Sequence, residues 1–151
     1  MGPLTRRIMA TSSSLPLAII RIVLAFVVLP HGLQKAFGMF GGFGFSGTMQ
    51  YFTQTLGIPG PLAFMVFVAE LAAPVALILG LWSRPAAMLI FINFVVAASM
   101  HTANGFFMNW NGAMPAGTEG YEYHLLVLSM SLAIIVGGSG SVSLDRRAIQ
   151  A

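Results

Sequence analysis

Two charged side chains interrupt long apolar stretches of this sequence, and they are the first candidates for chemistry. Arg21 stands within Leu15–Phe37, and Glu70 stands within Pro61–Trp82. The whole chain has only 7 Lys and Arg and 4 Asp and Glu residues, so two charges in such stretches are unusual. An ionised group in an apolar medium is costly unless it is paired. We therefore predict an Arg21–Glu70 ion pair that fixes the packing of two helices; a charged site facing a cavity is the alternative.

A second set of polar side chains falls near the far ends of the apolar stretches. His31 and His101 each lie about 24 Å of helix beyond the start of their stretch. Lys35 shares a helix face with His31, and Glu122 and His124 begin a further apolar stretch. Imidazole, ammonium and carboxylate groups at one depth can bind a quinone head group and pass protons. We predict His31, Lys35, His101 and Glu122 as this ligand site; the alternative is anchoring of helix ends at the membrane surface.

Metal and thiol chemistry are not expected. His31, His101 and His124 lack the short spacing of local metal motifs. The sequence has no cysteine, which excludes thiolate nucleophiles and cysteine-ligated iron–sulfur clusters on this chain.

The composition indicates a membrane protein. Of the 151 residues, 57% are hydrophobic and 7% are charged, whereas soluble domains carry about 25% charged residues. The net charge of +3 is not arranged as a basic stripe, so nucleic-acid binding is not expected.

Helices that cross a membrane must position these side chains. We expect an all-α bundle of four membrane-spanning helices: Leu15–Phe37, Pro61–Trp82, Pro85–Thr102 and Tyr121–Gly137. Four spans put Arg6, Arg7, Arg84, Arg146 and Arg147 on one side, which predicts that both termini are cytoplasmic. Residues 1–14 then form a cytoplasmic segment, 15–137 the membrane domain, and 138–151 a polar, flexible cytoplasmic tail. We read the first stretch as an uncleaved helix rather than a signal peptide.

Two further local features bear on the site. The connection Gly38–Gly60 has apolar residues at helical spacing, which predicts a short interfacial helix; an irregular, glycine-rich loop is the alternative. Pro74 removes the hydrogen bond that the Glu70 carbonyl would accept, so a kink is expected beside Glu70. Asn93 is expected to form a hydrogen bond between helices.

The order of short motifs resembles the DoxX family of small bacterial and archaeal membrane proteins. The motifs are Pro30-His31-Gly32-Leu33-Gln34-Lys35, Gly57-Ile58-Pro59, Ala69-Glu70-Leu71, Gly80-Leu81-Trp82-Ser83-Arg84, Gly105-Phe106-Phe107, Glu119-Gly120-Tyr121-Glu122-Tyr123 and Ser143-Leu144-Asp145. The resemblance covers about residues 15–147. It implies a four-helix membrane bundle in the plasma membrane of a bacterium or archaeon. The polar positions that recur in the family match Arg21, His31, Lys35, Glu70, Arg84, His101 and Glu122.

The resemblance also implies a function. Some relatives are described as the small subunit of a thiosulfate:quinone oxidoreductase, and others are tied to complexes that handle oxidative or thiol stress. We therefore expect an integral membrane subunit of a quinone-linked redox complex, with a protein partner; a homo-oligomer is also open. Whether the chain itself is an enzyme is open. The alternatives are a non-catalytic membrane anchor or assembly factor, or a small transporter that uses Glu70 as a proton-linked site.

Overall fold

The computed structural model describes residues 2–115 and 117–150, and within them the chain is 74% helical and has no strands. The elements, in order, are α1 (Pro3–Met9), α2 (Leu15–Phe37), η1 (Met39–Gly41), α3 (Gly44–Gln50), η2 (Tyr51–Thr55), α4 (Gly60–Phe67), η3 (Val68–Ala72), α5 (Ala73–Leu79), α6 (Ser83–His101), η4 (Thr102–Asn104), α7 (Glu122–Gly137) and α8 (Leu144–Gln150). Elements η1 and η4 are 3₁₀ turns, whereas η2 and η3 are π-helical. The predicted all-α class is confirmed.

Three helical segments are long and apolar enough to cross a membrane. They are Leu15–Phe37, Gly60–Leu79 and Ser83–Asn104. The second is a single helical segment in which α4, η3 and α5 follow one another without a gap. Helix α7 is also apolar but has only 16 residues, below the roughly 20 that a span usually needs.

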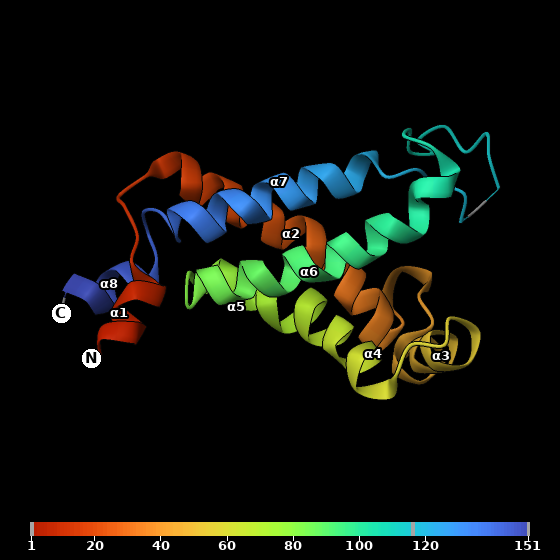
Figure 1. Cartoon of the computed structure of the whole chain (residues 1–151), viewed down its shortest axis with the longest axis horizontal. Helices are drawn as coiled ribbons and strands as arrows, with labels where there is room; N and C mark the ends of the chain where they lie inside the picture. Colours follow the sequence, from red (N-terminus) through yellow and green to blue (C-terminus); the bar gives the residue numbers. More distant parts are fainter. Residues whose placement is uncertain (1, 116, 151) are drawn as a thin grey trace.

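The long helices lie side by side, and both chain termini are at one end of the bundle (Figure 1). We call this the terminal end; it also carries α1 and α8, which contact each other. The opposite end, here the loop end, carries α3 and the connection between α6 and α7. Helix α2 crosses the α6–α7 pair obliquely rather than running parallel to it (Figure 1).

The core between these helices is small and apolar. Leu24, Leu77, Ile90 and Ile134 are fully buried, one from each of α2, α5, α6 and α7. The same helices expose large apolar side chains on their other faces, including Phe26, Ile92 and Leu126. A helix that is apolar on all faces needs an apolar surrounding, which fits a bundle in lipid.

Local sequence signals set the ends of α2. The Ser14 hydroxyl accepts a hydrogen bond from the Leu17 N–H (3.3 Å), and Pro16 lies in the first turn. Gly38 ends the helix in the left-handed conformation, at φ 71°. The short helix predicted after it is present as α3 and continues into η2.

Arg21 is buried at the terminal end, where it donates to four backbone carbonyls. Its Nε donates to Ser139 O (2.9 Å) and its Nη2 to Val142 O (3.0 Å). Its Nη1 donates to Leu77 O and to Ile78 O, the latter at 3.0 Å. Carbonyls in the last turn of a helix lack partners within it and carry the negative end of its dipole. Arg21 therefore caps α5 and ties it to the turn after α7.

The predicted ion pair between Arg21 and Glu70 is wrong. The Glu70 carboxylate pairs with Lys35 instead, with 2.6 Å between Nζ and Oε2. The backbone carbonyls that accept from Arg21 lie beside it at the terminal end, whereas Glu70 lines the pocket at the loop end.

Asp145 plays the complementary part at the same end. Its two carboxylate oxygens accept from the backbone N–H groups of Trp82 (2.7 Å) and Ser83 (3.0 Å), where α6 begins. A negative group is favourable there because the first N–H groups of a helix lack partners and the dipole is positive.

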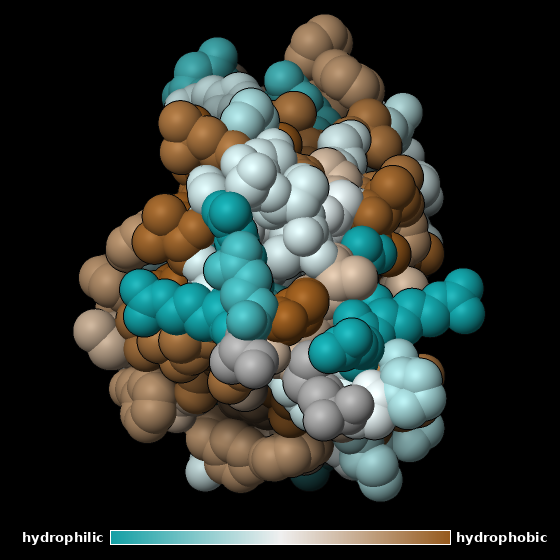
Figure 2. Space-filling view, turned by 90° about the vertical axis from the view of Figure 1, so that its left-hand side faces the viewer, coloured by the Kyte–Doolittle hydropathy of each residue, from teal (hydrophilic) through white to brown (hydrophobic). Residues whose placement is uncertain are grey.

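Arg84, at the start of α6, bonds two more segments at the terminal end. Its Nε and Nη2 donate to Ala10 O (3.2 and 3.0 Å), which follows α1, and its Nη1 donates to Ile135 O near the end of α7. Hydrophilic side chains project from this end of the molecule, with hydrophobic surface beside them (Figure 2).

Residues 139–150 are therefore ordered, and the prediction of a flexible tail is wrong for them. Residues Ser139 and Ser143 are buried, and Asp145 N donates to Gly80 O at 2.8 Å. Serines and glycines are typical of flexible chain, but here the Ser139 and Val142 carbonyls are the partners of the buried Arg21 guanidinium.

Candidate functional site

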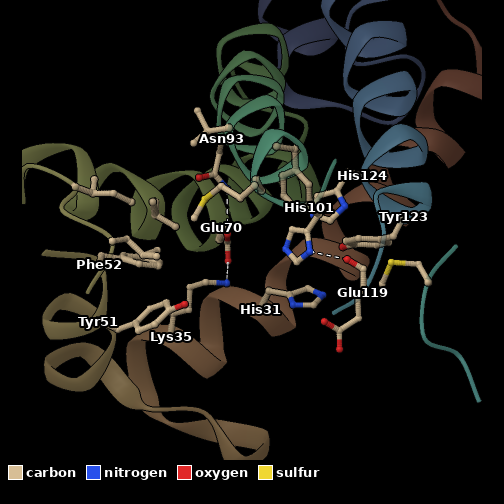
Figure 3. Close-up of a pocket in the computed structure, with 18 residues that line it drawn as sticks. His31, Lys35, Tyr51, Phe52, Glu70, Asn93, His101, Glu119, Tyr123 and His124 are labelled. Atoms are coloured by element: carbon tan, nitrogen blue, oxygen red, sulfur yellow. Dashed lines mark hydrogen bonds and ion pairs between the residues drawn. The ribbon is translucent and has the colours of Figure 1, made fainter. Parts of the chain in front are cut away.

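A pocket of about 490 Å³ opens at the loop end of the bundle (Figure 3). Cavities that hold small molecules span roughly 300–1,000 Å³. Most of the lining is apolar, and the polar side chains come from five elements: His31 and Lys35 (α2), Tyr51 (η2), Glu70 (η3), Asn93 and His101 (α6), and Tyr123 and His124 (α7). Glu119 and Met108 of the α6–α7 connection complete this end.

A charged network forms one part of the pocket. Lys35 Nζ lies 2.6 Å from Glu70 Oε2, and Asn93 Nδ2 donates to Glu70 Oε1 at 3.0 Å. The side chain of Glu70 is 7% exposed and that of Lys35 is 27% exposed. These contacts fix both carboxylate oxygens from two different helices. The hydrogen bond predicted for Asn93 is confirmed, and its partner is Glu70.

The local backbone explains how Glu70 reaches this position. Glu70 lies in the π-helical turn η3, and Pro74 follows in the first turn of α5. The wider turn interrupts the regular helix beside Glu70, where a kink was predicted. Gly32 of α2 lies directly against the Glu70 carbonyl, at a place where any Cβ atom would overlap it. A glycine is therefore required for α2 to bring its polar face up to Glu70.

The second π-helical segment also borders the pocket. Element η2 contributes Tyr51 and Phe52, which lie across from the histidines in Figure 3, with Glu70 between. Short π-helical turns are uncommon and are found frequently at functional sites. Both such turns in the described residues thus supply side chains to one pocket.

Aromatic and imidazole rings form the other part of the pocket. The ring centroids of His101 and His124 are 4.8 Å apart, and those of His31 and Tyr123 are 5.8 Å apart. His101 Nδ1 lies 2.7 Å from Glu119 O. Because a carbonyl oxygen can only accept, Nδ1 carries the hydrogen, and Nε2 of the neutral ring is an acceptor.

Two buried polar atoms of this part have no partner among the described residues. They are Tyr123 Oη and His124 Nδ1. Leaving such a group unpaired costs about 1–3 kcal/mol. Both atoms are covered by neighbouring side chains, so a ligand or water in the pocket pairs with them only after a small shift of those side chains exposes them.

A family profile matches the chain: the DoxX profile aligns with residues 16–110. This chain belongs to the DoxX family. The family resemblance drawn from the motifs is confirmed.

Two bacterial proteins are similar to this DoxX protein. "Inner membrane protein YphA" of Escherichia coli (strain K12) is 30% identical over 133 residues, covering 87% of this chain and 89% of that protein. "Putative oxidoreductase CatD" of Bacillus subtilis (strain 168) is 28% identical over 127 residues, covering 84% and 82%. No solved structure matches the chain.

Together with the three apolar helices, the family places this DoxX protein in the bacterial plasma membrane as a multi-pass protein. The predicted location is confirmed. The profile includes Lys35, Glu70, Asn93 and His101, whereas Tyr123 and His124 lie beyond its last matched residue. The charged part of the pocket is thus within the matched region, and the α7 part is outside it.

The structure brings together three of the four residues predicted as the ligand site. His31, Lys35 and His101 all line the pocket. Glu122 does not; its carboxylate accepts from Met108 N (3.2 Å) and Trp110 Nε1 (3.3 Å) and holds the α6–α7 connection. Within residues 2–115 and 117–150, no three His, Asp or Glu side chains are arranged to hold a metal ion.

The sequence reasoning misjudged Glu70 most. We predicted that it fixes the packing of two helices, with a charged site facing a cavity as the alternative, and it lines the pocket. Asn93, the one amide in an otherwise apolar helix, was the available signal, since it marks the depth at which a polar partner must lie.

Proposed function

We propose that the pocket of this DoxX protein binds the head group of a quinone, and that the chain is the membrane subunit of a redox complex. The observation that carries the proposal is the unpaired Tyr123 hydroxyl, buried in a mostly apolar pocket whose other part holds the Lys35–Glu70–Asn93 network. A quinone has apolar ring faces and two carbonyl acceptors at opposite edges. Tyr123 donates to one carbonyl, and Lys35 donates to the other.

The surrounding groups suit proton transfer. Two-electron reduction of a quinone takes up two protons, and imidazoles are effective carriers near neutral pH. His31 and His124 lie on either side of Tyr123, within ring-centroid distances of 5.8 and 5.7 Å. In this proposal the chain binds the ring and supplies protons, while a partner protein of the complex supplies the electrons. The word "oxidoreductase" in the name of the Bacillus relative supports a redox role.

We propose further that α7 is a fourth span and that both termini are cytoplasmic. Helix α7 covers the same depth as α6: Arg84 of α6 bonds Ile135 at one end, and His101 lies against His124 at the other. All arginines outside the apolar stretches then share one side, as the positive-inside rule requires. Phosphatase and fluorescent-protein fusions after Ala151 test this, and an active periplasmic phosphatase there would contradict it.

Titration of a short-chain quinone into purified protein tests the head-group site. The wild type should bind saturably, and His31→Ala and His101→Ala should bind more weakly, because each removes a ring that lines the pocket. Glu122→Gln is the matched control, because Glu122 was a candidate on sequence grounds but lies outside the pocket. Variants are compared only if their thermal unfolding matches the wild type.

Each result is decisive for the site. Absence of saturable binding to the wild type means that the pocket is not a quinone site, which leaves the membrane anchor or assembly factor. Binding that is unchanged in both histidine variants means that the ligand site is elsewhere. The polar residues predicted as the ligand site then anchor the helix ends at the membrane surface. Copurification from native membranes, followed by mass spectrometry of bound proteins, identifies the redox partner.

A further inference from the structure

We propose that the pocket is entered sideways from the bilayer, between α6 and η2, and that its ligand is a lipid-dissolved quinone whose apolar tail stays in the membrane. The inference rests on the proposed head-group site and adds the class of ligand and its route. Water-soluble quinones and catechols without a tail are not the class for which this opening is shaped.

The side of the pocket between α6 and η2 is bordered by exposed side chains. Tyr51 is 47% exposed, Val96 is 51% exposed and Met100 is 49% exposed, and all three line the pocket. We call these three residues the rim. A pocket residue that is half exposed lies where the cavity meets the outside. By contrast, Glu70 and His124 are buried, at 5% and 7%.

The outside at this point is lipid. Val96 and Met100 lie on α6, one of the helices able to span the membrane. Val96 is about 8 Å of helix from His101 at the end of α6, and Asn93 is about 12 Å from it. Val96 is therefore below the end of α6, in the part of the helix that faces hydrocarbon, whereas Met100 lies in its last turn. A molecule that passes Val96 comes from the bilayer, not from water.

Polarity changes from the rim inward. Apolar residues of the lining directly follow two of the rim residues in the chain: Phe52 follows Tyr51 and Ala97 follows Val96. The Lys35–Glu70 pair and Tyr123 line the same pocket. An amphiphile matches this order in only one orientation, with its polar ring inside and its apolar tail leading out past the rim. The pocket is polar enough for a head group, and the three rim residues themselves are uncharged.

The test uses two neighbouring residues of α6 that are equally exposed. Val95 is 45% exposed but does not line the pocket, whereas Val96 does. Val96→Trp should fill the opening, and Val95→Trp adds the same bulk to a surface that faces lipid only. Met100→Trp is a second rim variant. All are reconstituted in nanodiscs of defined phospholipid, with a short-chain quinone and a quinone bearing a long isoprenoid tail as probes.

We expect Val96→Trp and Met100→Trp to bind the long-tailed quinone at least about tenfold more weakly, or to slow its association by that factor. Val95→Trp should behave as the wild type. The short-chain quinone should lose less than about threefold in either rim variant, because it has no tail to pass the rim.

Two outcomes overturn the route. Equal binding of the long-tailed quinone by Val96→Trp and Val95→Trp shows that the tail does not pass the rim. Equal losses for both probes in Val96→Trp show that Val96 borders the ring rather than the tail. Failure of the head-group site is distinct, since there the wild type does not bind the short-chain quinone at all.

Discussion

The two ends of the bundle both bury charge, but they satisfy it in different ways. At the terminal end, Arg21 and Asp145 bond backbone groups that helix ends leave free. At the loop end, the partners of the Glu70 carboxylate among the described residues are the side chains of Lys35 and Asn93, beside a cavity. Backbone partners are fixed by the fold and cannot leave, whereas side-chain partners can reorient toward a ligand. The kind of partner, and not the mere presence of a charge in an apolar helix, separates the structural end from the candidate site.

The largest effect is expected from removing the guanidinium at the terminal end. Arg21→Met leaves several buried carbonyls without a donor, and should lower the free energy of unfolding by about 3–5 kcal/mol. Arg147→Met, an exposed arginine at the same end, should cost less than about 0.5 kcal/mol. Thermal or denaturant unfolding in mild detergent measures both. Equal stability of the two variants would show that the Arg21 contacts do not hold the bundle.

The loop-end pair should show coupling between its members. Lys35→Met leaves the Glu70 carboxylate without its cation, and Glu70→Gln removes the charge from the other side. In a double-mutant cycle we expect a coupling of about 1–3 kcal/mol between Lys35 and Glu70. The matched cycle between Arg21 and Glu70 should be additive within about 0.5 kcal/mol, because these residues share no contact. Coupling between Arg21 and Glu70, together with additivity between Lys35 and Glu70, would instead support the Arg21–Glu70 ion pair predicted from the sequence.

The cap on α6 should contribute less. Asp145→Ala removes both acceptors from the first turn of α6, and should cost about 0.5–2 kcal/mol. Gln150→Ala, an exposed position on the same short helix, serves as control. Quinone binding should be unchanged in the folded Asp145 variant. A loss of quinone binding without a loss of stability would show that the terminal end also contributes to the ligand site, and would contradict its purely structural role.

The smallest change in stability is expected inside the pocket. Tyr123→Phe removes a buried hydroxyl that has no partner among the described residues. The free energy of unfolding should stay within about 0.5 kcal/mol or rise slightly, because nothing is left unpaired. Binding of the short-chain quinone should weaken by about two- to tenfold, the value of one hydrogen bond. Tyr121→Phe, outside the pocket, is the control. A clear loss of stability would make the hydroxyl structural.

The helices were predictable because their signals are local. The predicted segment Leu15–Phe37 has the same bounds as α2, since Ser14, Pro16 and Gly38 mark its ends by backbone chemistry. The short helix at Gly44–Gln50 likewise followed from apolar spacing. Such signals act within a few residues, so the sequence is enough to read them.

The partners of the charges were not predictable for two physical reasons. Arg21 bonds backbone carbonyls, and every residue has one, so Leu77 and Ile78 carry no mark of that role. In addition, counting residues along a helix gives depth only when the helix is upright. Helix α2 is oblique (Figure 1), and Gly32 lies level with Glu70. Lys35, one turn beyond Gly32 on α2, is thereby brought to the Glu70 carboxylate.

The contacts of Arg21 also set an order of events during synthesis. Arg21 belongs to the first long helix, yet its acceptors Ser139 and Val142 stand 118 and 121 positions later in the chain. At about 5–20 residues per second, Val142 is made roughly 6–24 s after Arg21. During that interval the first helix resides in the membrane with an incompletely paired guanidinium. The last dozen residues therefore act as a closing step for the whole bundle, and a nascent chain that stops at Gly138 is expected to remain a substrate for membrane quality-control proteases.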